Sequence, residues 1–439
     1  MAGLAAAHRL HAAGAEVLLV ERGALGGRAQ AREQHGFRIE AAPLLLGARD
    51  RTLHQLAGSL PNAAEQPFLR PVATAQLHAG ELRPTDAVDL AGLRRLPGMP
   101  LREGFRLLRL ARLVRRFETL LGADHPEHAT RLDDRSVSDF VRLYFGDAVL
   151  ACWSAPLLAA DLGLESADTS RVALLRHHVG RAELGLGRLR TSVSVFASQL
   201  AQGAQPVAGD VRGLRATTSG YELALASGAR VEADAVVLAL PPHEALRVAG
   251  DLLVQPERDF LAASRAEPAL AASFACEGAL VPHSLWVRIP LDAGLPLASA
   301  AFEPGAVHGF APPGRTLAQL VAAPRFSRAH LEASDDTIAG ALAAALERLR
   351  PGAGRSAQPL AIHRFEWARP RFDVGRYRAL AQLARVEADR RARGRRLYLA
   401  GDYLNAPTLE GAAASGARAA RAASADLSLQ ANEPARVAR

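Results

Sequence analysis

The first 28 residues constrain the fold more than any other segment. An Ala- and Leu-rich stretch, AGLAAAHRLHAAG, ends at Gly14, and the short apolar run EVLLVE ends in the acid Glu21. The first stretch predicts a helix with a glycine at its C-terminus, and the second predicts a buried parallel strand. A helix followed by a strand that ends in an acid is the second half of a dinucleotide-binding βαβ unit, in which the acid binds a ribose hydroxyl. The fold class expected from this unit is α/β, and Gly3 is the glycine that lets helix and strand pack closely.

A glycine pair and an arginine follow the acid in the stretch ERGALGGRAQ. Gly26 and Gly27 let the backbone approach a ligand, and the guanidinium of Arg28 can bind a phosphate. A complete unit also has a strand and two earlier glycines before the helix. We expect this strand and turn about ten residues upstream of Met1, the length of one strand and its turn.

The C-terminal stretch RRLYLAGDYLNAPTLEGAAASGARAA carries a second, more specific signal. LYLAG predicts a buried strand, and Asp402 follows Gly401 at its end. A helix of small residues comes next, with Thr408 as its expected N-cap. Because the N-terminus of a helix stabilises negative charge, this segment predicts a site for an anionic ligand.

The middle of the chain adds a third segment of the same type. Residues 203–246 are predicted to form several short strands separated by Gly or Ser turns. The apolar run VVLAL closes the series, and Pro241 and Pro242 begin the next helix.

Together the three segments resemble the flavin amine oxidase superfamily, which includes monoamine oxidases, protoporphyrinogen oxidases and carotenoid desaturases. These families share the order GxGxxGL, helix, strand ending in Glu, and GGR. The resemblance implies an FAD-dependent oxidoreductase. The residues that it implies for FAD binding are Gly3, Glu21, Arg22, Gly26, Gly27, Arg28, Val211, Pro241, Gly401, Asp402, Glu410, Gly411 and Ala412.

The resemblance also implies what several of these residues do. Asp402 binds ribityl or pyrophosphate oxygens, and the backbone of Val211 pairs with adenine. The helix amides at 410–412 lie at the pyrimidine edge of the flavin, where the reduced ring is negative. FAD is expected to be bound non-covalently, because neither cysteine lies near this helix in the sequence.

A discontinuous domain organisation follows from the resemblance. A Rossmann-like FAD-binding domain consists of residues 1–50, 191–248 and 383–424, and a mixed α+β substrate domain consists of residues 51–190 and 249–382. Residues 51–190 are expected to be mainly helical and to form a cap. Residues 425–439 are expected to be a disordered tail.

The substrate half resembles protoporphyrinogen oxidases in two stretches. One begins at Ser136, a good N-cap before a helix, and the other is HRFEWARPRFDVGRYRAL. The resemblance places Trp367, Tyr377 and Tyr403 at the flavin or substrate face, and core packing is the alternative for these aromatic residues. No acid–base constellation is recognisable, so no catalytic residue is assigned. The histidines form no metal-binding set that the sequence reveals.

The choice of reaction rests on the absence of lysine. Flavin itself accepts the hydride, and the protein positions the substrate. Many amine oxidases of the superfamily use a lysine near the flavin, and this chain has none. The first hypothesis is therefore a protoporphyrinogen or coproporphyrinogen oxidase of tetrapyrrole synthesis. A carotenoid or squalene-type desaturase acting on a polyene is the second hypothesis, and a non-catalytic relative with impaired FAD binding is the third.

Charge and composition bear on partners and location. The formal net charge is +8, which suits an acidic ligand or an anionic membrane surface. Nucleic acid is not an expected partner, because acidic residues are interspersed and aromatic residues are few. Residues 100–121 form a basic amphipathic pattern that suits peripheral membrane contact. Two distant cysteines fit a reducing compartment, so the predicted location is the cytoplasm, with membrane association as an additional hypothesis.

Overall fold

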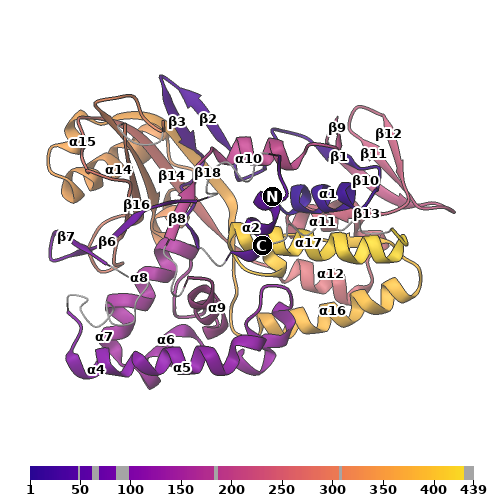
Figure 1. The fold of residues 1–439 in the computed structure, drawn as a ribbon, viewed down its shortest axis with the longest axis horizontal. Helices are drawn as coiled ribbons and strands as arrows, with labels where there is room; N and C mark the ends of the chain where they lie inside the picture. The colour runs from indigo at the N-terminus through magenta and orange to yellow at the C-terminus, as the bar shows by residue number, and fades with distance from the viewer. Residues whose placement is uncertain (48–49, 62–68, 86–97, 182–185, 306–308, 430–439) are drawn as a thin grey trace.

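The computed structural model describes all residues except 48–49, 62–68, 86–97, 182–185, 306–308 and 430–439. The described elements form three regions (Figure 1): a cofactor half with α1 and α17 at its centre, a large sheet with helices beside it, and a group of helices below both. No described helix combines the length and the apolar character needed to cross a bilayer.

Two pairs of parallel strands from distant parts of the chain form the centre of the cofactor half. Strand β1 (Leu18–Glu21) pairs with β9 (Gln205–Ala208), and β13 (Val236–Leu238) pairs with β19 (Leu397–Leu399). Parallel pairing between the N-terminal, middle and C-terminal segments confirms the predicted α/β fold and its discontinuous cofactor domain.

Helices α1 (Ala2–Ala12) and α17 (Leu409–Asp426) pack directly on one another in this half. A Cβ atom on Gly416 would lie 2.0 Å from the carbonyl oxygen of Ala2, so only glycine allows this approach. The antiparallel strands β10 (Val211–Ala216), β11 (Tyr221–Leu225) and β12 (Arg230–Ala233) and the helices α10 (Val193–Leu200), α11 (Pro242–Ala249), α12 (Gln255–Ala262) and α16 (Arg376–Ala392) complete the half.

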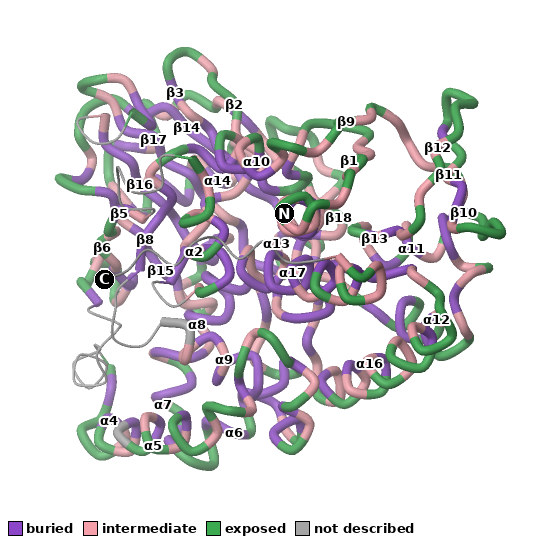
Figure 2. Tube along the Cα trace, turned by 45° about the vertical axis from the view of Figure 1, so that its right-hand side comes forward, coloured by how far each residue is buried: buried purple, intermediate pink, exposed green. Residues whose placement is uncertain are grey.

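The large sheet has seven strands in the order β18-β14-β17-β16-β15-β6-β7. Their bounds are β6 Ala73–His78, β7 Glu81–Pro84, β14 Ala266–Glu277, β15 Leu285–Arg288, β16 Leu297–Pro304, β17 Arg315–Ala322 and β18 Gln358–Pro370. Only the β15–β6 pair is parallel among these neighbours. Strands β14, β16 and β17 are buried along most of their length (Figure 2), and α14 (Asp335–Leu349) and α15 (Ala353–Ser356) pack against β14. Its strands fall within 51–190 and 249–382, the segments expected to form the substrate domain, and this region is called the substrate half below.

The group of helices lies between residues 101 and 181. It contains α4 (Leu101–Arg106), α5 (Leu108–Phe117), α6 (Val137–Tyr144), α7 (Asp147–Val149), α8 (Ala155–Leu157) and α9 (Arg171–Arg181), with 3-10 turns at Glu118–Leu120 and Pro126–Leu132 and π-helical turns at Leu150–Ser154 and Leu158–Leu162. The Oγ of Ser136 accepts a hydrogen bond from the backbone N–H of Asp139 at 3.1 Å. Ser136 is therefore the N-cap of α6, as its sequence position predicts.

The described part of residues 51–190 is mainly helical, and it also contains strands that the sequence analysis did not anticipate. Besides α2 (Arg51–Gly58), the described part contains β5 (Leu69–Pro71), β6, β7 and, near its end, β8 (Leu186–Leu189). Ala79 and Gly80 have φ values of 49° and 83°, which close a tight hairpin between β6 and β7. The segment thus supplies an edge of the large sheet before its helices begin.

Two expected boundaries differ from the structure, and the amphipathic stretch at 100–121 is divided. The pattern at 100–121 gives two helices, since α4 ends and α5 begins around Leu107. The predicted boundary at 382/383 falls inside the continuous helix α16. Helix α17 extends to Asp426, into the predicted tail of 425–439, and most of that tail lies outside the described residues.

The hairpin β2 (Ala31–Gln34) and β3 (Phe37–Glu40) links the cofactor half to the sheet. Its turn residues His35 and Gly36 both have positive φ values, 51° and 76°. Phe37 and Ile39 of β3 pack against Phe310 and Leu317, so the hairpin is anchored in the substrate half.

Candidate active site

Arg28 connects three segments that are far apart in sequence. Gly26 and Gly27 have φ values of 103° and 58°, and a Cβ on Gly26 would lie 2.4 Å from the carbonyl oxygen of Ala29. This tight turn projects Arg28 so that its Nη2 lies 2.7 Å from Oδ2 of Asp402. Its Nη1 donates to the carbonyl oxygen of Ala368 in β18. Two residues predicted to bind the cofactor phosphates thus meet at one point.

The turn between β19 and α17 is equally constrained. The Oγ1 of Thr408 accepts a hydrogen bond from the backbone N–H of Gly411 at 2.9 Å, so Thr408 is the N-cap of α17, as predicted. A Cβ on Gly411 would lie 2.2 Å from the carbonyl oxygen of Ala406. The N-terminus of an 18-residue helix is therefore held next to Asp402, in the orientation that favours negative charge.

The side chain of Glu410 serves a different element. Its two carboxylate oxygens accept hydrogen bonds from the backbone N–H groups of Thr52 and Leu53, both at 2.9 Å, at the start of α2. Burial, and then the charge of Asp50, raise the pKa of Glu410 to about 7. Its side chain therefore binds α2, and the contribution predicted for a flavin is that of the helix amides at 410–412.

Residues expected at the ribose and adenine end also come together. The backbone N–H of Gly209 donates to the carbonyl oxygen of Glu21 at 3.0 Å, and Arg22 lies 3.8 Å from Glu244 of α11. Arg247 of the same helix donates to the carbonyl oxygen of Val211 at 3.0 Å. Glu21, Arg22 and Val211 therefore lie around the carboxyl end of β1.

Gly3 and Pro241 lie where α1 and α11 meet the strands. A Cβ on Gly3 would come within 3.1 Å of the Cβ of Ala239, just after β13, which is the close helix–strand approach that the sequence predicts. Pro241 directly precedes α11, and Pro242 is its first residue.

The three predicted substrate residues are placed differently. Trp367 of β18 is half-buried, and its ring lies 5.4 Å from that of His243 in α11. Its indole Nε1 is buried without an acceptor among the described residues. Tyr377 and Tyr403 are almost fully buried in the apolar core below the site. Trp367 thus lies between the two halves, while substrate contact by the two tyrosines stays a prediction.

The arrangement fits a flavin dinucleotide. The guanidinium of Arg28 and the N-terminus of α17 can bind phosphate or an anionic ring, and Glu21 can bind a ribose. The amino group of Met1 has its pKa lowered to about 6 by burial, and Arg28 and Asp402 act on it as well. The start of α1 therefore lies beside the same pair of charges.

Two charged side chains near this site, Asp161 and Arg369, escaped the sequence analysis. The carboxylate of Asp161, in the second π-helical turn, accepts hydrogen bonds from Arg288, His177 and Trp286 at 3.0 to 3.2 Å. Arg369 in β18 lies next to Ala368, and its Nη1 is 3.4 Å from the carbonyl oxygen of Pro407. Neither group belongs to a sequence motif, because their partners are 16 to 127 residues away for Asp161 and 38 for Arg369.

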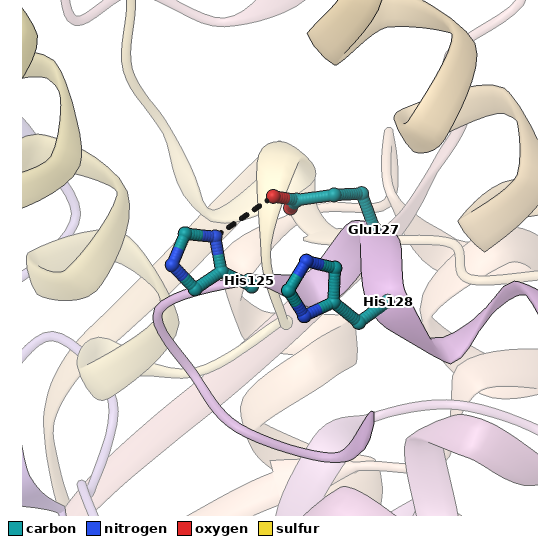
Figure 3. A group of neighbouring side chains, drawn as sticks. All are labelled: His125, Glu127 and His128. Atoms are coloured by element: carbon teal, nitrogen blue, oxygen red, sulfur yellow. Dashed lines mark hydrogen bonds and ion pairs between the residues drawn. The ribbon is translucent and has the colours of Figure 1, made fainter. Parts of the chain in front are cut away.

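The structure also brings together a His/Glu group that the sequence analysis overlooked. Figure 3 shows His125, Glu127 and His128 side by side, with ligand atoms within 4.8 Å of one another. Nδ1 of His125 is 2.9 Å from Glu127, and the two imidazole rings stack. The spacing H-x-E-H was the available signal. Glu127 also acts electrostatically on Arg418, so the group lies in partly basic surroundings.

The fold has two parts, a cofactor half built on parallel strands and a large, mostly antiparallel sheet, and the residues predicted to bind the cofactor lie in the first part. The model of the family described as flavin containing amine oxidoreductase matches residues 1–424. The chain belongs to this family and is a flavin-dependent oxidoreductase. No curated protein matches the chain.

Solved structures share the fold at low sequence identity. One is a protein from Exiguobacterium sp. 255-15 that is provisionally assigned as a protoporphyrinogen oxidase. It has a TM-score of 0.72 and 19% identity to this chain, with 97% of each chain covered. A putrescine oxidase double mutant has a TM-score of 0.71 and 17% identity over 97% of each chain. Cyclohexylamine oxidase from Brevibacterium oxydans has a TM-score of 0.69 and 17% identity over 97% of each chain. At these identities the comparison establishes the fold and leaves the substrate open.

Proposed function

We propose that the chain is an FAD-dependent porphyrinogen oxidase of tetrapyrrole synthesis, of the protoporphyrinogen or coproporphyrinogen type. The observation that carries the proposal is the absence of lysine, since all 53 residues counted as lysine or arginine are arginine. A lysine-assisted oxidation of an amine is therefore excluded. An arginine-rich chain of net charge +8 suits a substrate that bears carboxylates.

We further propose that the flavin is FAD and that it is bound non-covalently. Cys152 lies in the first π-helical turn of the helical group, and Cys276 is buried in strand β14 of the large sheet. Burial raises the pKa of the Cys276 thiol to about 11, which disfavours the reactive thiolate. Both cysteines belong to elements other than the β19–α17 turn that the proposal assigns to the flavin.

In this proposal the residues of the chain bind and orient, and the flavin supplies the hydride acceptor. Arg28 holds the phosphates together with the N-terminus of α17, whose amides also favour negative charge on the ring. Trp367 offers a flat face between β18 and α11 for a planar substrate.

The test compares two substrates under anaerobic conditions. The purified protein is expected to absorb near 450 nm, as bound flavins do, and acid precipitation should release FAD into the supernatant. Coproporphyrinogen or protoporphyrinogen is then expected to bleach this band, and phytoene is not. Bleaching by phytoene alone would favour a desaturase. A colourless protein that FAD cannot reconstitute would contradict the enzyme.

Peripheral membrane contact is the second part of the proposal. Leu101, Phe105 and Leu143 are 76%, 56% and 66% exposed. Phe105 and Leu143 belong to a groove of about 440 Å³ between α4, α5 and α6, hereafter the α4–α6 groove, whose lining is Arg102, Phe105, Arg106, Arg109, Leu143 and Tyr144. Exposed apolar side chains among guanidinium groups, with no acid in the lining, suit the headgroups and upper acyl chains of an anionic bilayer.

Vesicle co-sedimentation tests this contact. The protein is expected to sediment with phosphatidylglycerol vesicles and not with phosphatidylcholine vesicles. Replacing Arg102, Arg106 and Arg109 by Gln should weaken sedimentation about tenfold or more, since each basic residue near such a surface contributes about 1 kcal/mol. The matched control replaces the exposed Arg325, Arg355 and Arg364 by Gln. An equal loss of sedimentation in both variants would show that only the net charge matters. It would contradict specific membrane binding by the α4–α6 groove.

A further inference from the structure

Arg369 lies between the two halves of the molecule. It belongs to the end of β18, in the substrate sheet, and follows Ala368, whose carbonyl oxygen accepts a hydrogen bond from Arg28. Its guanidinium reaches the carbonyl oxygen of Pro407, directly before the N-cap of α17. The guanidinium of Arg369 therefore belongs to the substrate half and lies close to Arg28 and to the start of α17.

The surrounding chain leaves room for this side chain. Gly163 ends the second π-helical turn with a φ of 65°, and a Cβ at this position would lie 2.8 Å from Cγ of Arg369. The stem of Arg369 thus packs against a position where other residues would displace it. Because Gly163 has a left-handed backbone conformation and no Cβ, the stem of Arg369 fits against it. This contact fixes the position of the Arg369 guanidinium.

The guanidinium has no acidic partner among the described residues. Its one hydrogen bond there is the 3.4 Å contact with Pro407, which is long. Other arginines of the same segment are paired: Arg364 with Asp335, and Arg371 with Asp168, Glu267 and Asp373. Arg369 differs in this respect from Arg364 and Arg371, its neighbours in the sequence.

The nearby acids are already balanced by other groups. Asp402 pairs with Arg28, and Asp161 with Arg288 at 3.0 Å and with His177. Burial lowers the pKa of Arg369, and the like charge of Arg28 lowers it further. A cation held next to another cation and the positive end of a helix leaves excess positive charge, which an anion would neutralise.

We propose that Arg369 binds a carboxylate of the substrate and so selects substrates that carry one. This inference rests on the proposed function, which it deepens by assigning the anionic group of the substrate to one side chain. The location favours a substrate anion over a cofactor anion, because Arg369 and its contact Gly163 both come from the substrate half. The fork of N–H donors on arginine matches the two oxygens of a carboxylate.

Binding of matched acid and ester probes to the holoenzyme tests the proposal. The probes are a carboxylate-bearing porphyrin and its full methyl ester, and benzoate and methyl benzoate, each followed by the change in flavin absorbance or protein fluorescence. Arg369→Met should raise the Kd of the acids about 10- to 100-fold, and change the Kd of the esters less than about twofold. Arg369→Lys keeps the charge and should restore part of the affinity. Arg364→Met, on the exposed part of the same strand, is the control and should bind like the wild type.

Three results would overturn the proposal. Equal loss of acid and ester binding in Arg369→Met would indicate a structural role. If Arg369→Met binds the acids as tightly as the wild type, or if the wild type binds no acid, Arg369 is not the carboxylate-binding residue. If Arg369→Met still binds the acids but its flavin has a lower affinity for sulfite and a lower reduction potential, the charge of Arg369 acts on the flavin and not on the substrate.

Failure of the proposed function gives a different pattern. If no porphyrinogen reduces the flavin and no porphyrin binds, but benzoate binding depends on Arg369 and methyl benzoate binding does not, the tetrapyrrole assignment is wrong and the carboxylate site stands.

Discussion

At the scale of single residues, Arg28 is the best-supported functional side chain. It is projected by a turn that requires two glycines, and it joins Asp402 and β18 at one point. The side chain of Asp402 is 10% exposed, and Arg28 is its ion-pair partner. Arg28 therefore has two roles in this interpretation: it holds distant segments together, and it places a cation where a phosphate is expected.

Replacement of Arg28 by Met is expected to weaken FAD binding. The loss of charge-assisted hydrogen bonds should raise the Kd of FAD about 10- to 100-fold. Titration of the apo-protein with FAD, followed by flavin fluorescence, measures this change. Arg32→Met is the control, because Arg32 is exposed and donates only to the carbonyl oxygen of Leu360 among the described residues. An unchanged Kd in Arg28→Met would remove Arg28 from the cofactor site.

At the scale of elements, the start of α17 positions α2 as well as the proposed flavin edge. The carboxylate of Glu410 accepts hydrogen bonds from the first amides of α2, yet burial and the charge of Asp50 outweigh these bonds and raise its pKa from 4.5 to about 7. The contact between the two helices therefore depends on pH within the physiological range.

The stability of the protein is expected to reflect this titration. Because the pKa of Glu410 is higher in the folded than in the unfolded protein, its contribution is complete below pH 4.5 and is lost as the pH rises to about 7. The loss amounts to about 3 kcal/mol. Glu410→Gln cannot ionise, so the stability of the wild type relative to this variant should fall between pH 5 and 7.5 in thermal unfolding. Parallel pH profiles of the two proteins would be the contrary result.

At the scale of the whole molecule, a buried charge network joins the segments around the large sheet. Arg188 of β8 contacts Glu40 of β3 and lies 2.6 Å from Glu303 of β16. Arg70 of β5 lies 2.8 Å from the same Glu303, and each of these charged side chains is at most 3% exposed. The network fixes the N-terminal hairpin and the β5–β8 pair to the substrate sheet.

Removal of one cation from this network should be strongly destabilising. Arg188→Met leaves Glu40 and Glu303 buried with less compensation, and the free energy of unfolding should fall by about 3–5 kcal/mol. Urea denaturation of the holoenzyme measures the change. The control is Arg215→Met, since Arg215 is 63% exposed in its pair with Glu222 and surface ion pairs contribute little to stability. Similar losses in the two variants would rule out a special role for the buried network.

Local sequence patterns predicted the main elements of the cofactor half. The glycine pair before Arg28, the N-cap Thr408 and the proline start of α11 each specify their own backbone conformation, because turns and caps depend on neighbouring residues. The hairpin of β6 and β7 was missed, because a short alternating run in a mostly helical stretch becomes a strand only when a sheet edge is present.

The sequence by itself determined the fold class, the order of the cofactor segments and the residues of their turns, since these follow from local conformational preference and hydrophobic period. The tertiary structure alone decided which distant charges meet: Arg28 with Asp402, Glu410 with α2, and Arg369 with Gly163 and Pro407. Such contacts depend on long-range packing, and no local pattern records that Arg369 is left without an acidic partner among the described residues.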